Sequence, residues 1–121
     1  MDERKRRGDR GEALVADALS RRGFQILERQ YRSRWGEIDV IARSPIGTLC
    51  FVEVKTRRSD SFASAAAAVT PAKQERLRLT AQCYLAEREL DCRCRFDVAE
   101  VYPSPGYGWA RPRIHYIANA F

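Results

Sequence analysis

Two short runs of alternating apolar residues, separated by a turn, constrain the fold of this chain more than any other feature. They span residues 37–43 and 49–56, and the segment between them contains the turn-forming residues Ser44, Pro45 and Gly47. Alternation with a period of two indicates β-strands that bury one face. Two such runs joined by a short turn predict a β-hairpin, so we expect a protein built around a sheet.

The register of this hairpin follows from keeping like side chains on one face. If Asp39 stands opposite Glu53, apolar residues pair with one another and the charged residues gather on the other face. The expected cross-strand pairs are Ile38 with Val54, Val40 with Val52, Ala42 with Cys50, Ile41 with Phe51, and Glu37 with Lys55. A shift by one residue would mix charge with core on both faces. The preferred register needs an odd-numbered loop or a bulge near Pro45.

The remaining segments alternate between helix and strand patterns. Apolar residues recur at helical spacing from Gly8 to Arg22, and Thr70 before Pro71 is typical of a helix start. We expect this second helix to continue to Leu90. Strands are expected over residues 24–31, 95–102 and 114–118, with a loop over 58–69 and a Gly- and Pro-rich turn over 103–112. The predicted order is αβββαββ, an α/β fold.

Composition bounds the kind of protein further. The 121 residues, 45% of them hydrophobic, suit a single domain over residues 1–121 with a basic N-terminal tail over residues 1–7. No run of about 18 apolar residues and no apolar leader segment occur, so we expect a cytoplasmic protein without a membrane partner. The four cysteines lack the spacing of a zinc site and are expected to be free thiols. With a single histidine, chemistry would depend on carboxylates, lysine or oxygen-bound metal ions.

The net charge of +6 favours a polyanionic partner, although an arginine-rich chain can also simply present a soluble basic surface. All of the 22 basic residues except Lys5, Lys55 and Lys73 are arginine. Clusters lie before Gly36 and after the second strand of the hairpin. The side chains expected to hold a nucleic-acid backbone are Arg32, Arg34, Arg57, Arg58 and Lys73.

The charged end of the hairpin is the candidate site. Asp39 and Glu53 on adjacent strands would repel each other unless a cation lay between them, and Mg²⁺ or Mn²⁺ prefers such oxygen ligands. Lys55 shares the face of Glu53, where an ammonium would position a water and stabilise charge developing on a phosphate. Asp39, Glu53 and Lys55 are therefore the catalytic candidates, with Glu37 as a secondary one. The alternative is an exposed strand face with an ion pair between Glu37 and Lys55.

Two further carboxylates have competing interpretations. Glu12 lies at the border of the apolar stripe of the first helix, and its pattern alone indicates a first-turn acid favoured by the helix dipole. Asp97 points away from its apolar neighbours. A salt bridge from Asp97 to Arg95 or Lys73 fits the pattern as well as a catalytic role does.

The hairpin residues resemble a known enzyme superfamily. Asp39 followed by Glu53-Val54-Lys55 on the adjacent strand resembles the PD-(D/E)xK nucleases, whose restriction-endonuclease-like fold is a mixed central sheet flanked by helices. Ile38 stands where the superfamily pattern has proline. The chain is more closely similar to the YraN-like family of bacterial proteins over residues 8–102, in the segments 11–13, 36–42, 51–57 and 95–98 and at Lys73.

This resemblance implies a metal-dependent endonuclease related to Holliday-junction resolvases, with junction or branched DNA as its substrate. The implied metal ligands are Glu12, Asp39, Glu53 and the backbone carbonyl of Val54, and the implied catalytic lysine is Lys55. Two-fold substrates would favour a homodimer. Two alternatives stay open: a non-catalytic nucleic-acid-binding module on the same fold, and a structural partner of another protein that uses residues 63–69.

Overall fold

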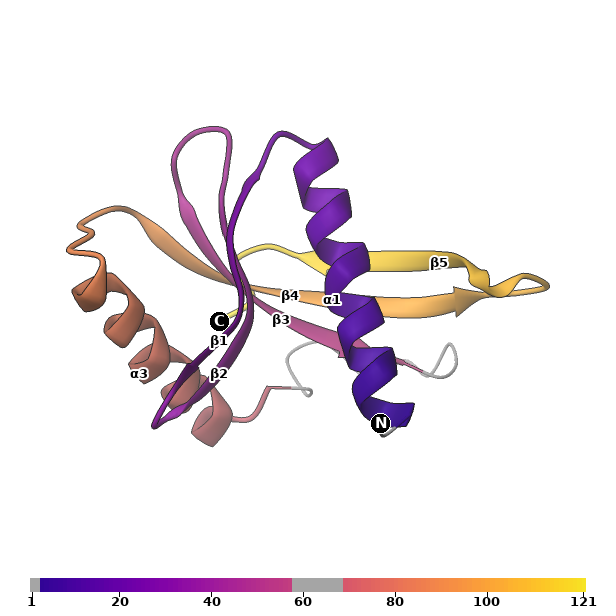
Figure 1. Cartoon of the computed structure of the whole chain (residues 1–121), viewed down its shortest axis with the longest axis horizontal. Helices are drawn as coiled ribbons and strands as arrows, with labels where there is room; N and C mark the ends of the chain where they lie inside the picture. The colour runs from indigo at the N-terminus through magenta and orange to yellow at the C-terminus, as the bar shows by residue number, and fades with distance from the viewer. Residues whose placement is uncertain (1–2, 58–68) are drawn as a thin grey trace.

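Two helices and one five-stranded sheet make up the described part of the chain, residues 3–57 and 69–121 of the computed structural model. The elements, labelled in Figure 1, are α1 (Glu3–Arg21), β1 (Gln25–Ser33), β2 (Gly36–Arg43), β3 (Leu49–Thr56), α3 (Pro71–Glu87), β4 (Cys94–Ser104) and β5 (Gly108–Ile117). This is the predicted αβββαββ order. Most of the loop expected over residues 58–69, and with it Arg58, lies outside the described residues.

The sheet is mixed and follows the chain order β1-β2-β3-β4-β5. Neighbouring strands are antiparallel except β3 and β4, which run parallel. These directions bring the turn between β1 and β2, the end of β3 and the turn between β4 and β5 to one end of the sheet. The first half of α1 lies there too, because a Cβ on Gly11 would stand only 2.6 Å from Thr56 Oγ1. We call this the Thr56 end.

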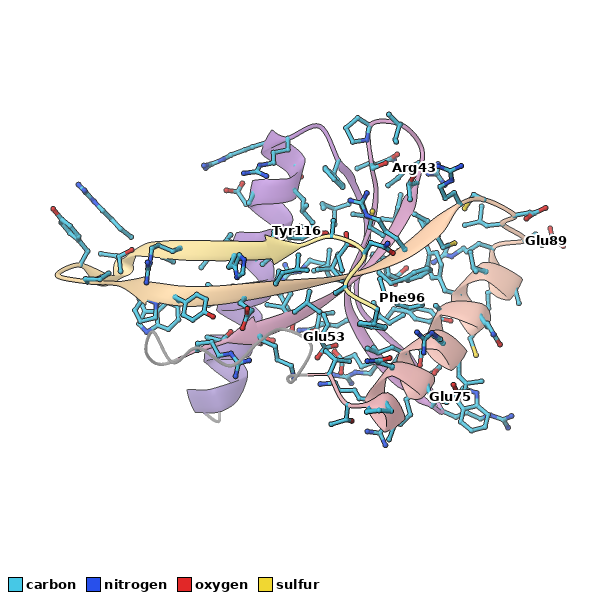
Figure 2. The ribbon with its side chains drawn as sticks, turned by 180° about the vertical axis from the view of Figure 1, so that it is seen from behind. Arg43, Glu53, Glu75, Glu89, Phe96 and Tyr116 are labelled. Atoms are coloured by element: carbon cyan, nitrogen blue, oxygen red, sulfur yellow. The ribbon has the colours of Figure 1, made fainter. Side chains whose placement is uncertain are left out.

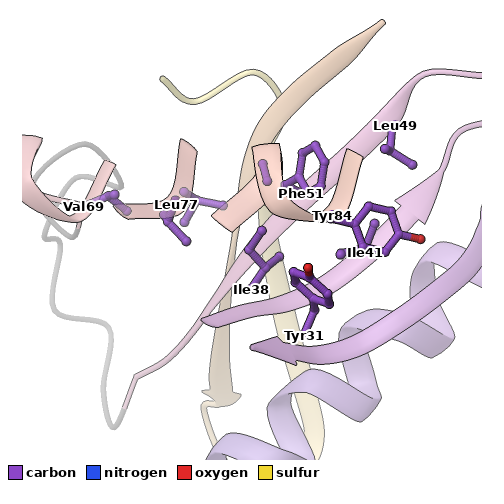
Figure 3. Close-up of a cluster of buried hydrophobic side chains, with 10 residues drawn as sticks. Tyr31, Ile38, Ile41, Leu49, Phe51, Val69, Leu77 and Tyr84 are labelled. Atoms are coloured by element: carbon purple, nitrogen blue, oxygen red, sulfur yellow. The ribbon is translucent and has the colours of Figure 1, made fainter. Parts of the chain in front are cut away.

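Each face of the sheet is covered by one helix. On one face, a cluster that includes Ile41 and Phe51 packs against Leu77 and Tyr84 of α3 (Figure 3). On the other face, a cluster of alternate strand residues packs against α1, with Val40 and Val52 beside Val15 and Leu19. The predicted fold class, a mixed sheet flanked by helices, is confirmed.

The hairpin has the predicted register over its inner half. Val40 pairs with Val52, Ile41 with Phe51 and Ala42 with Cys50, and residues 44–48 form the odd-numbered loop. The outer half differs, because the ladder ends at Val40 and Val52. Ile38, expected on the same face as Val40, packs instead in the α3 cluster. The alternation therefore breaks at Asp39, between these two residues.

Several element boundaries differ from the sequence prediction, and α3 ends at Glu87 rather than at Leu90. Helix α1 begins at Glu3 rather than Gly8, within the segment expected to be a tail. The turn expected over residues 103–112 is wrong, because β4 continues to Ser104 and β5 begins at Gly108. Gly106 and Gly108 have φ of 79° and 54°, which closes a tight turn between them and leaves the rest of the segment extended. A proline at residue 112 is tolerated since β5 is an edge strand.

Two smaller expectations agree with the structure. The Thr70 side chain caps α3 by accepting a hydrogen bond from the Lys73 backbone N–H over 3.2 Å. All four cysteines are free thiols. None of the helices in residues 3–57 and 69–121 combines the length and the apolar character needed to cross a membrane.

Candidate functional site

Asp39 lies where β2 separates from β3, while the pairing of β2 with β1 continues to Gly36. Beyond the Val40–Val52 pair, the backbone N–H of Val54 donates to Asp39 Oδ2 over 2.8 Å instead of to a strand carbonyl. On the other side of β2, Gln30 of β1 has a φ of 54°, a left-handed conformation that is uncommon for a residue with a side chain. Such strained positions concentrate at functional sites. The break in alternation at Asp39 is thus accompanied by an unusual backbone conformation at Gln30 of β1 and by the hydrogen bond from Val54 of β3.

Several carboxylates act on Asp39 at once. Burial, followed by the charge of Glu53, raises the pKa of the Asp39 carboxyl to about 8, and Glu12 and Glu37 add to the rise. The hydrogen bond from Val54 opposes it only in part. The negative charges of the three other carboxylates therefore all disfavour the charged form of Asp39.

Glu53 is buried and lies between two lysines. Its Oε1 atom is 2.8 Å from Lys73 Nζ and 3.5 Å from Lys55 Nζ. Figure 2 shows Glu53 on the central part of the sheet, close to the first turns of α3. Burial and the neighbouring Lys73 lower the pKa of Lys55, whereas Glu53 outweighs burial and raises the pKa of Lys73. The two ammonium groups therefore differ in how readily they give up a proton.

Lys73 is held in this position by local sequence. The Thr70 cap and Pro71 start α3 so that Lys73 falls in its first turn. A cation is unfavourable at the positive end of the helix dipole, and the Glu53 carboxylate compensates for it. We expected Lys73 to hold a nucleic-acid backbone; the structure brings it into contact with Glu53.

Glu12 of α1 forms another wall of the site. It is buried, its Oε1 has no hydrogen-bond partner among the described residues, and burial raises its pKa. An open cavity of about 430 Å³ adjoins it. The cavity is lined by Gly8, Asp9, Glu12, Gln30, Arg32, Glu37 and Asp39. Helix α1 thus brings a third carboxylate to the space beside Asp39.

The donor set fits a divalent cation of the Mg²⁺ type. Within residues 3–57 and 69–121, no group of three or more His, Cys, Asp or Glu side chains is arranged to hold a metal ion. Mg²⁺ commonly uses only one or two carboxylates, with waters and substrate phosphates as its other ligands. Asp39 and Glu53 match that requirement, and a cation would relieve the mutual repulsion that raises the pKa of Asp39. Glu12 Oε1, without a hydrogen-bond partner in the part of the chain that the structure describes, is a further oxygen ligand beside the same cavity.

The arginines predicted to hold nucleic acid divide into two groups. On the β1–β2 hairpin, Arg32 is exposed and pairs with Glu37 over 3.4 Å, and Arg34 is exposed with its Cζ 4.6 Å from the ring centroid of Trp35. Arg57 at the end of β3 is mostly buried and pairs with Glu100 over 3.3 Å. The expected pairing of Glu37 with Lys55 is wrong, because the strands have separated there and each residue contacts a nearer partner.

Asp97 lies outside this cluster. Both of its oxygens accept hydrogen bonds from Arg95 Nε over 3.1 Å, and the Tyr116 hydroxyl donates over 2.5 Å. The backbone N–H of Asn119 donates to Oδ1 over 2.8 Å. Of the two interpretations left open for Asp97, the salt bridge to Arg95 is the one present.

Gln30 is a site residue that the sequence did not reveal. Its Nε2 donates to Asp9 Oδ1 over 2.8 Å, and its side chain also bonds to Glu12, which lowers the pKa of that carboxyl in opposition to burial. It lines the same cavity as Asp39. No pattern in a single sequence distinguishes this glutamine from any other polar strand residue.

Comparison with known proteins identifies close relatives. The model of the "Uncharacterised protein family UPF0102" matches residues 11–101. A UPF0102 protein of Symbiobacterium thermophilum is 46% identical over 118 residues, which cover 97% of each chain. Similar proteins occur in Trichlorobacter lovleyi, 43% identical over 94% of this chain and 88% of the relative, and in Chlorobium chlorochromatii, 52% identical over 78% of this chain and 72% of the relative. The matched region contains Glu12, Asp39, Glu53, Lys55 and Lys73.

Proposed function

The chain belongs to the UPF0102 family, and from the site at the Thr56 end of its sheet we propose that it is a divalent-cation-dependent endonuclease. Its substrate would be DNA, cut by hydrolysis of phosphodiester bonds. The exposed arginines on the β1–β2 turn attract phosphates by charge and do not specify bases. Selection by the shape of the DNA, as at a junction or branch, is therefore part of the proposal.

One observation carries the proposal: the partly buried Asp39 and the buried Glu53 interact electrostatically on adjacent strands, and Lys55 Nζ is 3.5 Å from Glu53 Oε1. A protein that only bound phosphate would gain nothing from burying like charges together. A nuclease needs them to hold a cation next to the scissile phosphate.

Each residue of the site would have a distinct role in cleavage. Asp39 and Glu53 would hold the cation, with the Val54 carbonyl and Glu12 as further ligands. When bound, the cation supplies Lewis-acid stabilisation of the negative charge on the phosphate and acidifies water. Lys55, whose pKa is lowered, would orient the attacking water and accept or share its proton. Lys73, whose pKa is raised, stays charged and would stabilise the phosphate oxygens.

Cleavage assays test the proposal directly. Four-way junctions, flaps, linear duplexes and matched RNA would be incubated with Mg²⁺ or Mn²⁺ and with EDTA. Wild-type protein should cut at least one DNA, and Lys55→Ala and Asp39→Asn should reduce the rate by on the order of 10²-fold or more. Arg21→Ala, which removes an exposed ion pair with Asp17, is the control and should cut normally. Equal activity of all variants, or cleavage in EDTA, would exclude this mechanism.

A non-catalytic nucleic-acid-binding module is the second candidate, because Lys73 already neutralises Glu53 at 2.8 Å without a metal ion. Titration calorimetry with Mn²⁺ separates the two. A nuclease site should bind Mn²⁺ saturably, and Lys73→Met should tighten binding by removing the competing ammonium. No saturable binding by either protein would favour the module.

A further inference from the structure

The paired ends of β4 and β5 form an arm that projects beyond the rest of the sheet (Figures 1 and 2). Tyr102 pairs with Arg113 and Ser104 with Gly108, so the arm is a two-stranded ribbon with a short turn and an irregularity in its pairing between Tyr102 and Ser104. The chain from Val101 to its end contains two arginines, one histidine and no Asp or Glu. This segment therefore presents positive charge without acidic residues of its own.

The face of the arm that carries Arg113 and His115 continues the face of the sheet that carries Glu53 and Lys55. Ile114 and Tyr116 of β5 pack toward α1, so the alternating residues Arg113 and His115 lie on the opposite face, and both are exposed. Arg111, beside the irregularity in the β4–β5 pairing, is exposed as well. On β4, Val98 packs toward α3, the same side as its neighbour Glu53 on β3.

The register links the arm to the site in a continuous row. Lys55 of β3 lies beside Glu100 of β4, and Glu100 lies opposite His115 of β5. Glu100 also holds Arg57 over 3.3 Å and His115 Nδ1 over 3.4 Å. From Lys55 outward, the row therefore leads through paired groups to the exposed Arg113, and the exposed Arg111 lies two residues from it on β5.

The chemistry of this row suits a nucleic-acid backbone. Residues two apart on a strand are separated by about 6.6 Å, a spacing comparable with that of successive phosphates on one strand. Arg111 is held with its Cζ 4.3 Å from the Tyr107 ring centroid, and Arg113 with its Cζ 5.9 Å from that of Tyr102. Aromatic contacts of this kind limit the freedom of the guanidinium groups and leave them charged.

We propose that the β4–β5 arm is a second nucleic-acid-binding element, in which Arg111 and Arg113 hold the phosphate backbone of the DNA that flanks the cleavage site. This inference rests on the proposed function for its substrate. The β1–β2 turn with Arg34 and the arm lie at the same end of the sheet, on either side of Asp39 and Glu53. A bound duplex would thus contact the protein on both sides of the scissile bond.

Salt-dependent binding in EDTA tests the arm without requiring cleavage. Fluorescence anisotropy with labelled junction and duplex DNA would compare wild type with the double variant Arg111→Ala/Arg113→Ala. The matched control is Arg22→Ala/Arg93→Ala, which removes two exposed arginines at the opposite end of the sheet. The arm variant should lose on the order of tenfold in affinity, and the slope of log K against log salt should become less steep by about 2. The control should change neither.

A third variant, Arg111→Lys/Arg113→Lys, keeps the charges and should retain most of the affinity and nearly all of the salt slope. Thermal unfolding of all variants checks that the fold is intact. The arm proposal is overturned if the arm variant and the control bind alike, as they would if the arm served a protein partner, or if wild type binds neither DNA nor RNA. If the arm variant behaves as expected but no DNA is cut, the arm stands and the nuclease proposal fails.

Discussion

Asp39 and Asp97 occupy equivalent places in the sequence, each between two apolar residues of a strand, yet their surroundings differ. Asp97 is fully buried and accepts hydrogen bonds from Arg95, Tyr116 and the Asn119 backbone. Asp39 accepts one from Val54 and lies beside other carboxylates.

The difference separates a structural carboxylate from one that is available for a ligand. Arg95, Tyr116 and the Asn119 backbone N–H all donate to the Asp97 carboxylate, and the pKa of its partner Tyr116 is raised first by burial and then by the bond to Asp97. Around Asp39 the charge is disfavoured, and its pKa rises to about 8. Strong perturbation in an open cavity is typical of functional groups. The same amide substitution at both positions should therefore have opposite effects.

The largest expected effect is on stability at Asp97. Asp97→Asn leaves Arg95 without its buried partner and should lower the free energy of unfolding by about 3–5 kcal/mol. Asp39→Asn keeps an acceptor for Val54 and removes a disfavoured charge, so in EDTA at neutral pH it should be neutral or stabilising. Urea unfolding measures both. Equal destabilisation by the two substitutions would contradict the distinction.

The next effect is the pH dependence of stability in EDTA. The folded-state pKa of Asp39, about 8, lies above its ordinary 3.8, so between these values the folded protein keeps a proton that the unfolded chain has released. The stability associated with this proton is fully present below pH 3.8 and is lost as the pH rises through 8. The slope contributed is at most about 1.4 kcal/mol per pH unit. Asp39→Asn should remove this component from the unfolding profile; identical profiles would refute it.

Divalent cation should stabilise the folded protein by a comparable or smaller amount. At a Mn²⁺ concentration about 100 times its Kd, a single site adds about 2.7 kcal/mol to the free energy of unfolding. Thermal unfolding of wild type at pH 8 should shift upward with Mn²⁺ and return with EDTA. Asp39→Asn should show little of this shift and Asp97→Asn most of it. A shift retained in full by Asp39→Asn would separate metal binding from Asp39.

The smallest effect concerns the helix that carries Glu12. Gly11→Ala would bring a methyl group to 2.6 Å from Thr56 Oγ1, so α1 or β3 must shift, at about 1–3 kcal/mol of stability. Gly8→Ala meets no atom within 4 Å and should stabilise α1 by about 0.5–1 kcal/mol. Thermal unfolding compares them. The Gly11 variant should also bind Mn²⁺ less tightly, and normal binding would indicate that Glu12 is not a ligand.

Local pattern predicted most of the fold. Alternation located β3 to the residue and set the hairpin register at Val40 and Val52, because a shift by one position would have exposed every core side chain. The Thr70 cap likewise located the start of α3. Only the second half of β5 was predicted, as a strand over residues 114–118. Its first half was assigned to a turn because glycine and proline are typical of turns, and only pairing with β4 overrides that preference.

For the site, the sequence determined the inventory of charged groups and their order on two strands. Asp39, Glu53 and Lys55 could be selected because the hairpin register is a local property of side-chain polarity. The sequence did not determine which carboxylates remain uncompensated. Compensation depends on partners such as Arg95 and Tyr116 for Asp97, or Lys73 for Glu53, and β-sheet pairing and helix packing bring those together only in the folded chain. Tertiary structure therefore decided that Asp97 is a structural residue and that Asp39 faces an open cavity, where its negative charge is disfavoured. The reason is that burial and electrostatic interaction act through space and not along the sequence.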